Sequence, residues 1–246
     1  MAKLNWRAKI GVVFVLLSLA IYVIHYLIFH DAYHIFYYGI MDISFVFVQV
    51  LMVTLIIDQL LSGREKQVRL EKLNMVIGVF FSEVGLKMLG IFSSLDTEVE
   101  KVREHLIVRG NWDGGTFASV SAELKKYKCS IDIGRADIGS LREYVTSKRD
   151  FLTRLLENPV LLEHETFTEL LRAAFHLFEE LDFRTNIASL PQADIGHIRT
   201  DMERMYGLLI SEWLDYMKYL KENYPYLFSL AIRTNPFDSK ASPIVD

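Results

Sequence analysis

Cysteine and proline are both scarce in this sequence of 246 residues. It contains one cysteine, Cys129, and five prolines, four of which lie beyond residue 190. A single cysteine cannot form an intrachain disulfide, which suits a reducing compartment. The scarcity of proline, together with the lack of strand-like alternation of apolar and polar residues, predicts an all-α fold.

The motifs of several enzyme classes are also missing. The sequence has no P-loop, no G-x-G-x-x-G, no G-x-S-x-G, no H-E-x-x-H and no cysteine pair for zinc. The Gly-rich GNWDGG at residues 110–115 follows no predicted strand and is interpreted as a turn. No set of nucleophile, base and orienting group stands out, so we expect no enzymatic activity. The net charge of −4 gives no reason to expect nucleic-acid binding.

Long hydrophobic runs, by contrast, are prominent near the N-terminus. Residues 10–29 contain one ionisable residue, His25, and residues 43–61 contain one charge, Asp58. Twenty helical residues span about 30 Å, the thickness of the hydrocarbon core of a bilayer. The first run is longer than the apolar region of a signal peptide, and no small-residue cleavage site follows it. We therefore expect two transmembrane helices.

The positions of lysine and arginine predict the topology. Three basic residues precede the first run, four follow the second, and residues 30–42 contain neither lysine nor arginine. By the positive-inside rule, both termini are cytoplasmic and residues 30–42 form a short outer loop. We expect a multi-pass protein of the cell inner membrane, with a transmembrane hairpin over residues 1–62 and a cytoplasmic helical domain over residues 63–246. Two spans bury little of their polar surface alone, so we also expect a homo-oligomer within the lipid bilayer.

The remaining sequence predicts a helical bundle. The second run should continue as one long helix, because Gly63 is its only interruption before a stripe of apolar residues at helical spacing. This stripe consists of Leu73, Val76, Ile77, Phe80, Phe81 and Val84. Further helices are expected over residues 96–108, capped by Ser93 and Ser94, and over residues 116–127, from about 140 to 157, 163–183 and 191–223, with a short one from Pro225.

Polar residues inside the apolar runs suggest an ion path. On the second run, Asp42 and Gln49 share one face, and Ser44, Thr54 and Asp58 lie on roughly the opposite face. In an oligomer, Asp42, Gln49, Asp58 and His25 would line this path. The alternative is that Ser44 and Thr54 bond the carbonyl groups four residues earlier, and that Asp58 lies near Arg64. His25 is expected to bond Gln49 across the hairpin, or to act as a proton sensor beside Asp42.

Two groups of histidines and carboxylates have the spacing of metal ligands. In the outer segment, His30 and His34 are four residues apart, so both could bind one ion if the first helix continues past the membrane surface. Asp31 and Asp42 could complete the site. Helix capping and loop solubility are the alternative explanation.

The second group lies in the cytoplasmic domain. His176 with Glu180, and His197 with Asp201, form pairs of i and i+4 on consecutive helices, and the loop centre near Ile187 places both histidines at about the same height. Facing pairs of this kind build metal sites in helical bundles. A solvated charged face is the alternative. Aromatic residues at helical spacing, among them Phe175, Trp213, Tyr216, Tyr219 and Tyr224, are interpreted as core.

Two segments carry resemblances to known families. FHDAYHIFYYGIMDISFVFVQVLMVTLIIDQLL and REKQVRLEKLNMVIGVFFSEVG resemble a group of prokaryotic two-span membrane proteins with a cytoplasmic helical domain and no assigned activity. That resemblance implies the same topology. The four residues GIMD, 39–42, are similar to the D-I-M-E motif of the mitochondrial calcium uniporter. The Trp before that motif and the Glu-Pro that ends it are absent here, so its ion selectivity does not carry over.

These observations support two functional hypotheses. The first is a homo-oligomeric cation channel or transport protein that is gated by its cytoplasmic helical domain. The second is a membrane-anchored sensor or scaffold without transport activity, whose cytoplasmic domain binds a protein partner.

Overall fold

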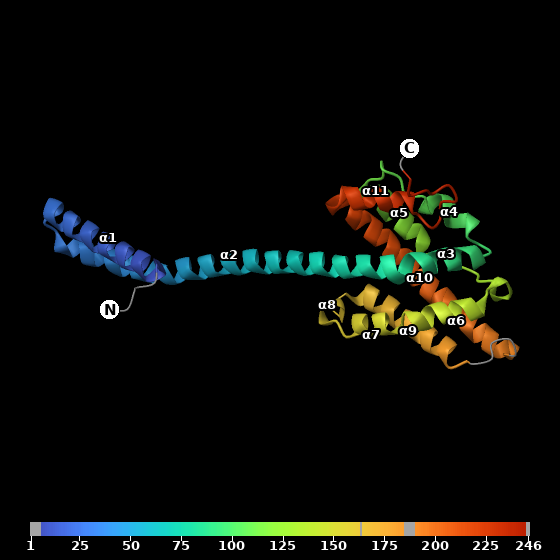
Figure 1. The fold of residues 1–246 in the computed structure, drawn as a ribbon. Coiled ribbons are helices and arrows are strands. Elements are labelled where there is room, and N and C mark those ends of the chain that lie inside the picture. Colours follow the sequence, from blue (N-terminus) through green and yellow to red (C-terminus); the bar gives the residue numbers. More distant parts are fainter. Residues whose placement is uncertain (1–5, 163, 185–189, 245–246) are drawn as a thin grey trace. The chain divides into compact units, whose positions relative to one another are not determined.

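The computed structural model describes residues 6–162, 164–184 and 190–244 (Figure 1). Every regular element in these residues is helical, and the one β-type pairing is an isolated bridge between Asp96 and Ile131. The all-α prediction is therefore confirmed for the described part of the chain. The structure divides into two compact units, Met1–Lys66 and Gln67–Asp246.

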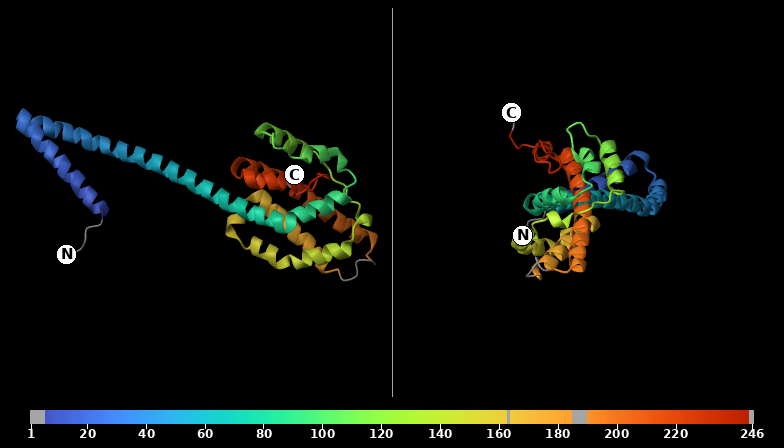
Figure 2. Two further views of the ribbon diagram at one scale, coloured as in Figure 1. Left: turned by 45° about the horizontal axis from the view of Figure 1, so that its top comes forward. Right: turned by 90° about the vertical axis from the view of Figure 1, so that its right-hand side faces the viewer.

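The first unit is a helical hairpin, formed by α1 (Trp6–Phe29) and the beginning of α2 (Ala32–Phe80). Only His30 and Asp31 connect the two helices (Figure 2). His30 adopts a φ of 50°, which ends α1. The Asp31 carboxylate accepts a hydrogen bond from the His34 backbone N–H at 3.2 Å, which caps α2. The connection is thus shorter than the predicted segment 30–42, because helix resumes at Ala32, and its location outside the membrane stays a prediction.

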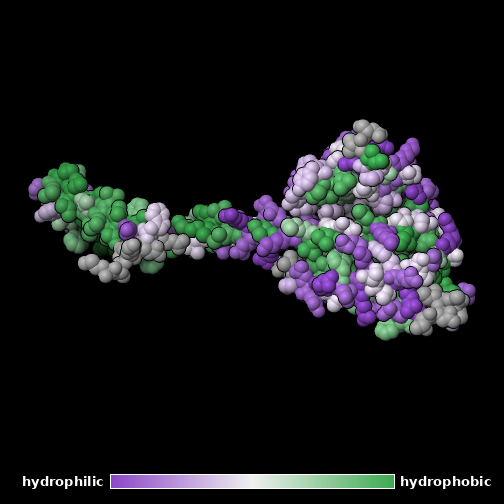
Figure 3. All heavy atoms as spheres, viewed as in Figure 1, coloured by the Kyte–Doolittle hydropathy of each residue, from purple (hydrophilic) through white to green (hydrophobic). Residues whose placement is uncertain are grey.

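Apolar side chains are exposed along both helices of this unit. Figure 3 shows them as a nearly continuous hydrophobic surface. By length and composition, both helices can cross a membrane. The Ser44 hydroxyl donates to the Ile40 carbonyl at 2.9 Å, and the Thr54 hydroxyl to the Val50 carbonyl at 2.7 Å. This confirms that these two hydroxyls are satisfied within their own helix.

The second unit begins with the last turns of α2, where the apolar stripe meets a core. Leu73, Ile77 and Phe80 are buried, and a π-helical turn, η1 (Phe81–Gly85), leads into α3 (Leu86–Leu95). Gly85 is needed in this turn, because an added Cβ would lie 2.5 Å from the Phe81 ring. The long helix and its buried stripe were both predicted, and both are confirmed.

The next helix is shorter than expected. It is α4 (Glu100–Leu106), whereas the prediction was 96–108. Ser93 and Ser94 do not cap it, because they lie in the last turn of α3 and donate to the Gly90 and Ile91 carbonyls. Buried Asp96 follows instead, and its carboxylate accepts from the Glu98 and Ser130 N–H groups and from the Tyr127 hydroxyl.

The remaining elements follow the predicted order with one helix divided. They are α5 (Gly114–Leu124), the 3-10 turn η2 (Ile133–Arg135), α6 (Ile138–Ser147), α7 (Arg149–Leu156), α8 (Pro159–Leu162), α9 (Glu165–Asp182), α10 (Gln192–Asn223) and α11 (Pro225–Arg233). Asp113 caps α5, so the last two glycines of GNWDGG are helical. The helix expected to end at 157 is interrupted at Lys148, and α6 and α7 both pack on α9.

The core of this unit is centred on α9 and α10, which pack against each other (Figure 1). Trp213 and Tyr206 of α10 and Phe167 of α9 are fully buried, and the Phe167 ring meets Phe80 edge-on at 5.3 Å. A core of this size can hold polar side chains at fixed positions where the two helices meet.

Candidate metal centre

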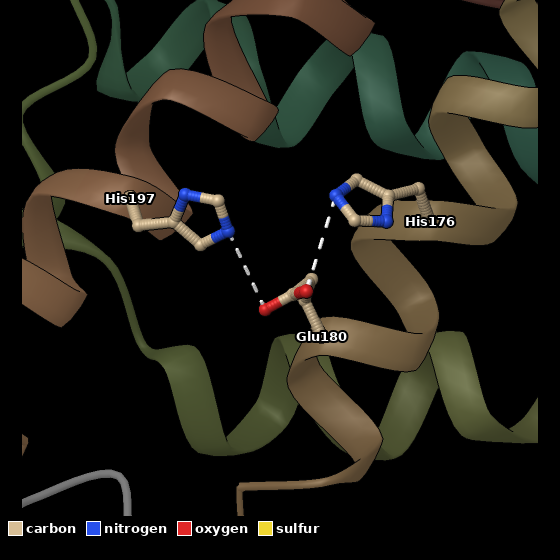
Figure 4. Close-up of side chains that lie close together, drawn as sticks. All are labelled: His176, Glu180 and His197. Atoms are coloured by element: carbon tan, nitrogen blue, oxygen red, sulfur yellow. Dashed lines mark ion pairs between the residues drawn. The ribbon is translucent and has the colours of Figure 1, made fainter.

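Two facing turns of α9 and α10 bring together the residues that the sequence singled out. His176 and Glu180 project from α9, and His197 projects toward them from α10 (Figure 4). The apolar residues next to them, Leu177 on α9 and Ile198 on α10, are completely buried and fix the two backbones. The predicted loop centre, Ile187, lies outside the described residues.

The two imidazoles share both carboxylates. His197 Nε2 lies 3.6 Å from a Glu180 oxygen and 3.4 Å from Asp201 Oδ2. His176 Nε2 lies 3.9 Å from the other Glu180 oxygen and 3.5 Å from the same Asp201 Oδ2. One atom each from His176, Glu180 and His197 lie within 4.8 Å of one another. Three side chains from two helices therefore lie close enough to hold one ion, and Asp201 Oδ2 adjoins both of their imidazoles.

Asp201 is the most unusual member of this group. Its side chain is only 3% exposed, and its Oδ2 is buried and has no hydrogen-bond partner. Its other oxygen lies 3.6 Å from an Arg204 nitrogen. A buried carboxylate oxygen without a donor is energetically unfavourable unless a positive charge compensates it. The alternative of a solvated charged face is therefore wrong for Asp201, although His176 and His197 are about half-exposed.

Glu180 is held from the opposite side by an arginine. Arg184 Nη1 donates to Glu180 at 2.5 Å, and its other nitrogens donate to both oxygens of Asp194 at 2.7 and 2.6 Å. Partial burial opposes ionisation of Glu180, but the hydrogen bond and charge of Arg184, with the charges of His197 and His176, outweigh it and lower the Glu180 pKa. Glu180 is therefore ionised at neutral pH, as a metal ligand must be.

The spacing of these donors suits a tetrahedral metal ion. Zinc–nitrogen and zinc–oxygen bonds of about 2.1 Å place neighbouring donors about 3.4 Å apart in a tetrahedron. Asp201 Oδ2 lies at about that distance from both imidazole nitrogens, and each imidazole lies 3.6 or 3.9 Å from a different oxygen of Glu180. Imidazole with carboxylate is a donor set for zinc and its neighbours in the first transition row rather than for calcium or magnesium.

The outer group of histidines is not assembled in the same way. Its condition was that the first helix continues past His30, but α1 ends at Phe29. His34 Nδ1 instead pairs with Asp31 at 2.5 Å, and His34 and Asp42 are exposed on α2. The described residues gather no three metal-ligand side chains around this turn. Asp31 and His34 thus pair with each other at the N-terminus of α2, where Asp31 caps the helix.

The predicted ion-path residues lie on the first unit. Asp42, Gln49 and Asp58 are exposed along α2. His25 has a buried Nδ1 without a hydrogen-bond partner, and its ring lies 4.8 Å from that of Phe29. The pairing of His25 with Gln49, its proton-sensing role and the ion path all stay predictions.

The sequence interpretation missed the residues that surround the metal centre. Arg184 and Asp194 orient Glu180, and Arg204 lies beside Asp201. One signal was present, because Arg184 follows Glu180 by four residues and Arg204 follows Asp201 by three, spacings that bring side chains together on a helix.

Comparison with known proteins finds one family over most of the chain. Residues 69–233 match the C-terminal helical domain of the uncharacterized protein MJ1433, and residues 2–61 match the N-terminal helical domain of MJ1433. The chain is also 44% identical to Uncharacterized protein MJ1433 of Methanocaldococcus jannaschii over 232 residues, which cover 94% of this chain and 93% of the relative. No solved structure matches significantly. The chain belongs to the MJ1433 family of helical proteins.

Proposed function

We propose that the helical domain, residues 67–246, binds one divalent transition-metal ion of the zinc class, and that the two N-terminal helices hold this domain at a membrane. The ligands are His176, Glu180, His197 and Asp201. The observation that carries the proposal is Asp201 Oδ2, a buried carboxylate oxygen without a hydrogen bond that lies 3.4 and 3.5 Å from two imidazole nitrogens.

Such an ion would connect α9 to α10. Each of these helices supplies one histidine and one carboxylate, so loss of the ion leaves two carboxylates beside two half-exposed imidazoles. A ligand that binds only the folded state stabilises it by about 2.7 kcal/mol at a hundred times its dissociation constant. Metal availability would thereby control how firmly the two central helices pack, and the proposed role is that of a membrane-anchored sensor or scaffold.

Metal binding is tested with the full chain in detergent micelles. The protein is stripped with a chelator and then titrated with Zn²⁺ against a chromophoric competitor. We expect one equivalent to bind, and His197→Ala to weaken binding about 100-fold or more, because loss of even an outer partner of a ligand costs 10- to 100-fold. His105→Ala is the matched control, since His105 pairs with Glu123 on an exposed surface at 2.8 Å.

Two results would overturn this proposal. One is the absence of stoichiometric binding of Zn²⁺, Co²⁺ or Ni²⁺. The other is an equal effect of His197→Ala and His105→Ala, which would mean that surface histidines bind metal without a defined site.

The membrane attachment is supported by the exposed apolar surface of α1 and of the beginning of α2 (Figure 3). Thiol labelling of intact cells tests the topology in a Cys129→Ser background. An impermeant reagent should label Ala32→Cys from outside, and should label Ser242→Cys only after permeabilisation. Extraction of the protein by alkaline carbonate without detergent would contradict membrane insertion.

A cation path through a homo-oligomer remains a second candidate. Its support is that Asp42 and Gln49 are exposed within an otherwise apolar stretch of α2, so a single chain does not enclose them. Proteoliposomes should then show cation flux that Asp42→Asn reduces. Tight liposomes at every potential and pH would remove this candidate.

A further inference from the structure

A second site lies where the end of α2 meets the end of α10 and the start of α11, all within residues 67–246. These helices enclose a cleft of about 430 Å³. Four tyrosines line it, and we call it the tyrosine cleft: Tyr216 and Tyr219 of α10, Tyr224 between the helices, and Tyr226 of α11. Sites for small molecules have volumes of about 300–1,000 Å³, so the cleft is large enough for a ligand.

The rings in this cleft are presented from several directions. Tyr219 and Tyr224 have centroids 5.8 Å apart at 54°, and Tyr224 and Tyr226 have centroids 6.3 Å apart at 88°. Tyr216 stacks on Phe81 on one side. Its hydroxyl reaches α2 at Gly78, where a Cβ would lie only 2.6 Å from that oxygen. Four aromatic rings at different angles to one another therefore border one space.

The wall of the tyrosine cleft carries no competing cation. Among its described lining residues there is no lysine, arginine or histidine. Lys221, which follows the lining residue Leu220, is engaged elsewhere, because it donates to the Gly110 carbonyl and lies over the Phe228 ring. A positive charge inside the cleft would therefore have to come from a ligand.

The surroundings also favour a positive charge. Burial, the neighbouring Tyr224 hydroxyl and the Glu71 carboxylate raise the Tyr219 pKa to about 12. The phenol is therefore neutral at physiological pH, while Glu71 supplies a nearby negative charge. At the mouth, Tyr226 is 71% and Met75 is 68% exposed. Large apolar side chains exposed around a cleft indicate a surface that a ligand covers.

We propose that the tyrosine cleft binds a weakly hydrated organic cation of the quaternary-ammonium class. The faces of aromatic rings attract such cations, and the apolar methyl groups replace the water that would otherwise contact Tyr226 and Met75. A neutral apolar ligand would gain the contact area but nothing from the ring quadrupoles or from Glu71. The tyrosine cleft and the metal centre have no residue in common.

The test compares choline with its uncharged isostere, 3,3-dimethyl-1-butanol, which has the same shape. Binding to the full chain in a non-ionic detergent is measured by calorimetry. Choline should bind at least about fivefold more tightly than the isostere, as cation–π attraction requires. Tyr226→Leu should abolish that preference, Tyr219→Phe should retain it because the ring remains, and Tyr22→Leu, on α1, is the matched control.

Each contrary outcome has a definite meaning. Equal binding of choline and the isostere would make the tyrosine cleft an apolar pocket only and overturn the proposal. No choline binding, with a change of oligomeric state in Tyr226→Leu, would identify the cleft as a contact between copies and would also overturn it. His197→Ala should leave choline binding unchanged, so failure of the metal proposal is distinguishable from failure here.

Discussion

In two helix pairs of this protein, the sequence predicts a metal site built from two histidines and two carboxylates, and the two groups differ in the structure. In the α1–α2 pair, His30 and His34 are separated by a helix break, and the apolar side chains around them are exposed. In the α9–α10 pair, His176 and His197 project from continuous helices over a buried core. Both groups contain residues four positions apart, but only the second has a buried scaffold and a buried carboxylate.

The largest expected effect comes from a substitution in the buried core centred on α9 and α10. Leu170 of α9 is completely buried, and Leu170→Ala should lower the free energy of unfolding by about 2–5 kcal/mol. Leu27→Ala is the matched control, because Leu27 of α1 is 62% exposed, and it should change domain stability by about 0.5 kcal/mol or less. Urea unfolding of the full chain in detergent, followed by tryptophan fluorescence, measures both. Equal losses would contradict the contrast between the two pairs.

The next effect concerns the buried carboxylate. Asp201→Asn should weaken zinc binding at least about 100-fold. It should leave the melting temperature of the metal-free protein unchanged or higher, since a neutral amide replaces a buried, partly compensated charge. Calorimetric titration and thermal unfolding without metal give the two readings. A purely structural role for Asp201 would instead lower the melting temperature of the metal-free variant.

A smaller effect is expected at Glu180. This side chain is 23% exposed and forms an ion pair with Arg184. Metal coordination would weaken that ion pair, so the net contribution of Glu180 to metal affinity is small. Glu180→Gln should weaken zinc binding about tenfold, less than Asp201→Asn does. The same competitive titration measures it. If Glu180→Gln were the more damaging change, Asp201 would not be the central ligand.

The smallest effect is expected in the other helix pair. His34→Ala removes the ion pair with Asp31 but no assembled metal ligand, so zinc affinity should change less than about twofold. Asp31→Ala should be the more damaging change in this turn, costing about 1 kcal/mol of helix stability, because Asp31 caps α2. Circular dichroism of the detergent-solubilised chain measures the helical content.

Much of the fold could be predicted because its signals are local. The apolar stripe from Leu73 to Val84 and the uninterrupted run through Gly63 predicted the continuation of α2 correctly. The helix breaks were harder to predict, since His30 takes a positive φ without a glycine, and Lys148 interrupts a helix without a proline. The break at Lys148 accompanies the packing of α6 and α7 on α9, which no local pattern records.

The metal centre could be predicted only in part. The i, i+4 pairs and their similar distances from the loop predicted that His176 and His197 face each other. The structure places these two side chains in that way (Figure 4). The burial of Asp201 was not predictable, because it depends on how α9 and α10 rotate against each other. The tyrosine cleft was missed for a similar reason. Tyr216, Tyr219 and Tyr224 have the spacing of core residues, and only the approach of α2 at Gly78 shows that they also line a cleft.

The most direct test of the metal centre is the visible absorption spectrum of the full chain loaded with Co²⁺, which reports coordination geometry. The two imidazoles and two carboxylates between α9 and α10 predict an intense, tetrahedral-type spectrum that is lost in His176→Ala and Asp201→Asn and retained in His34→Ala. A weak octahedral-type spectrum that is the same in all these variants would contradict the assignment.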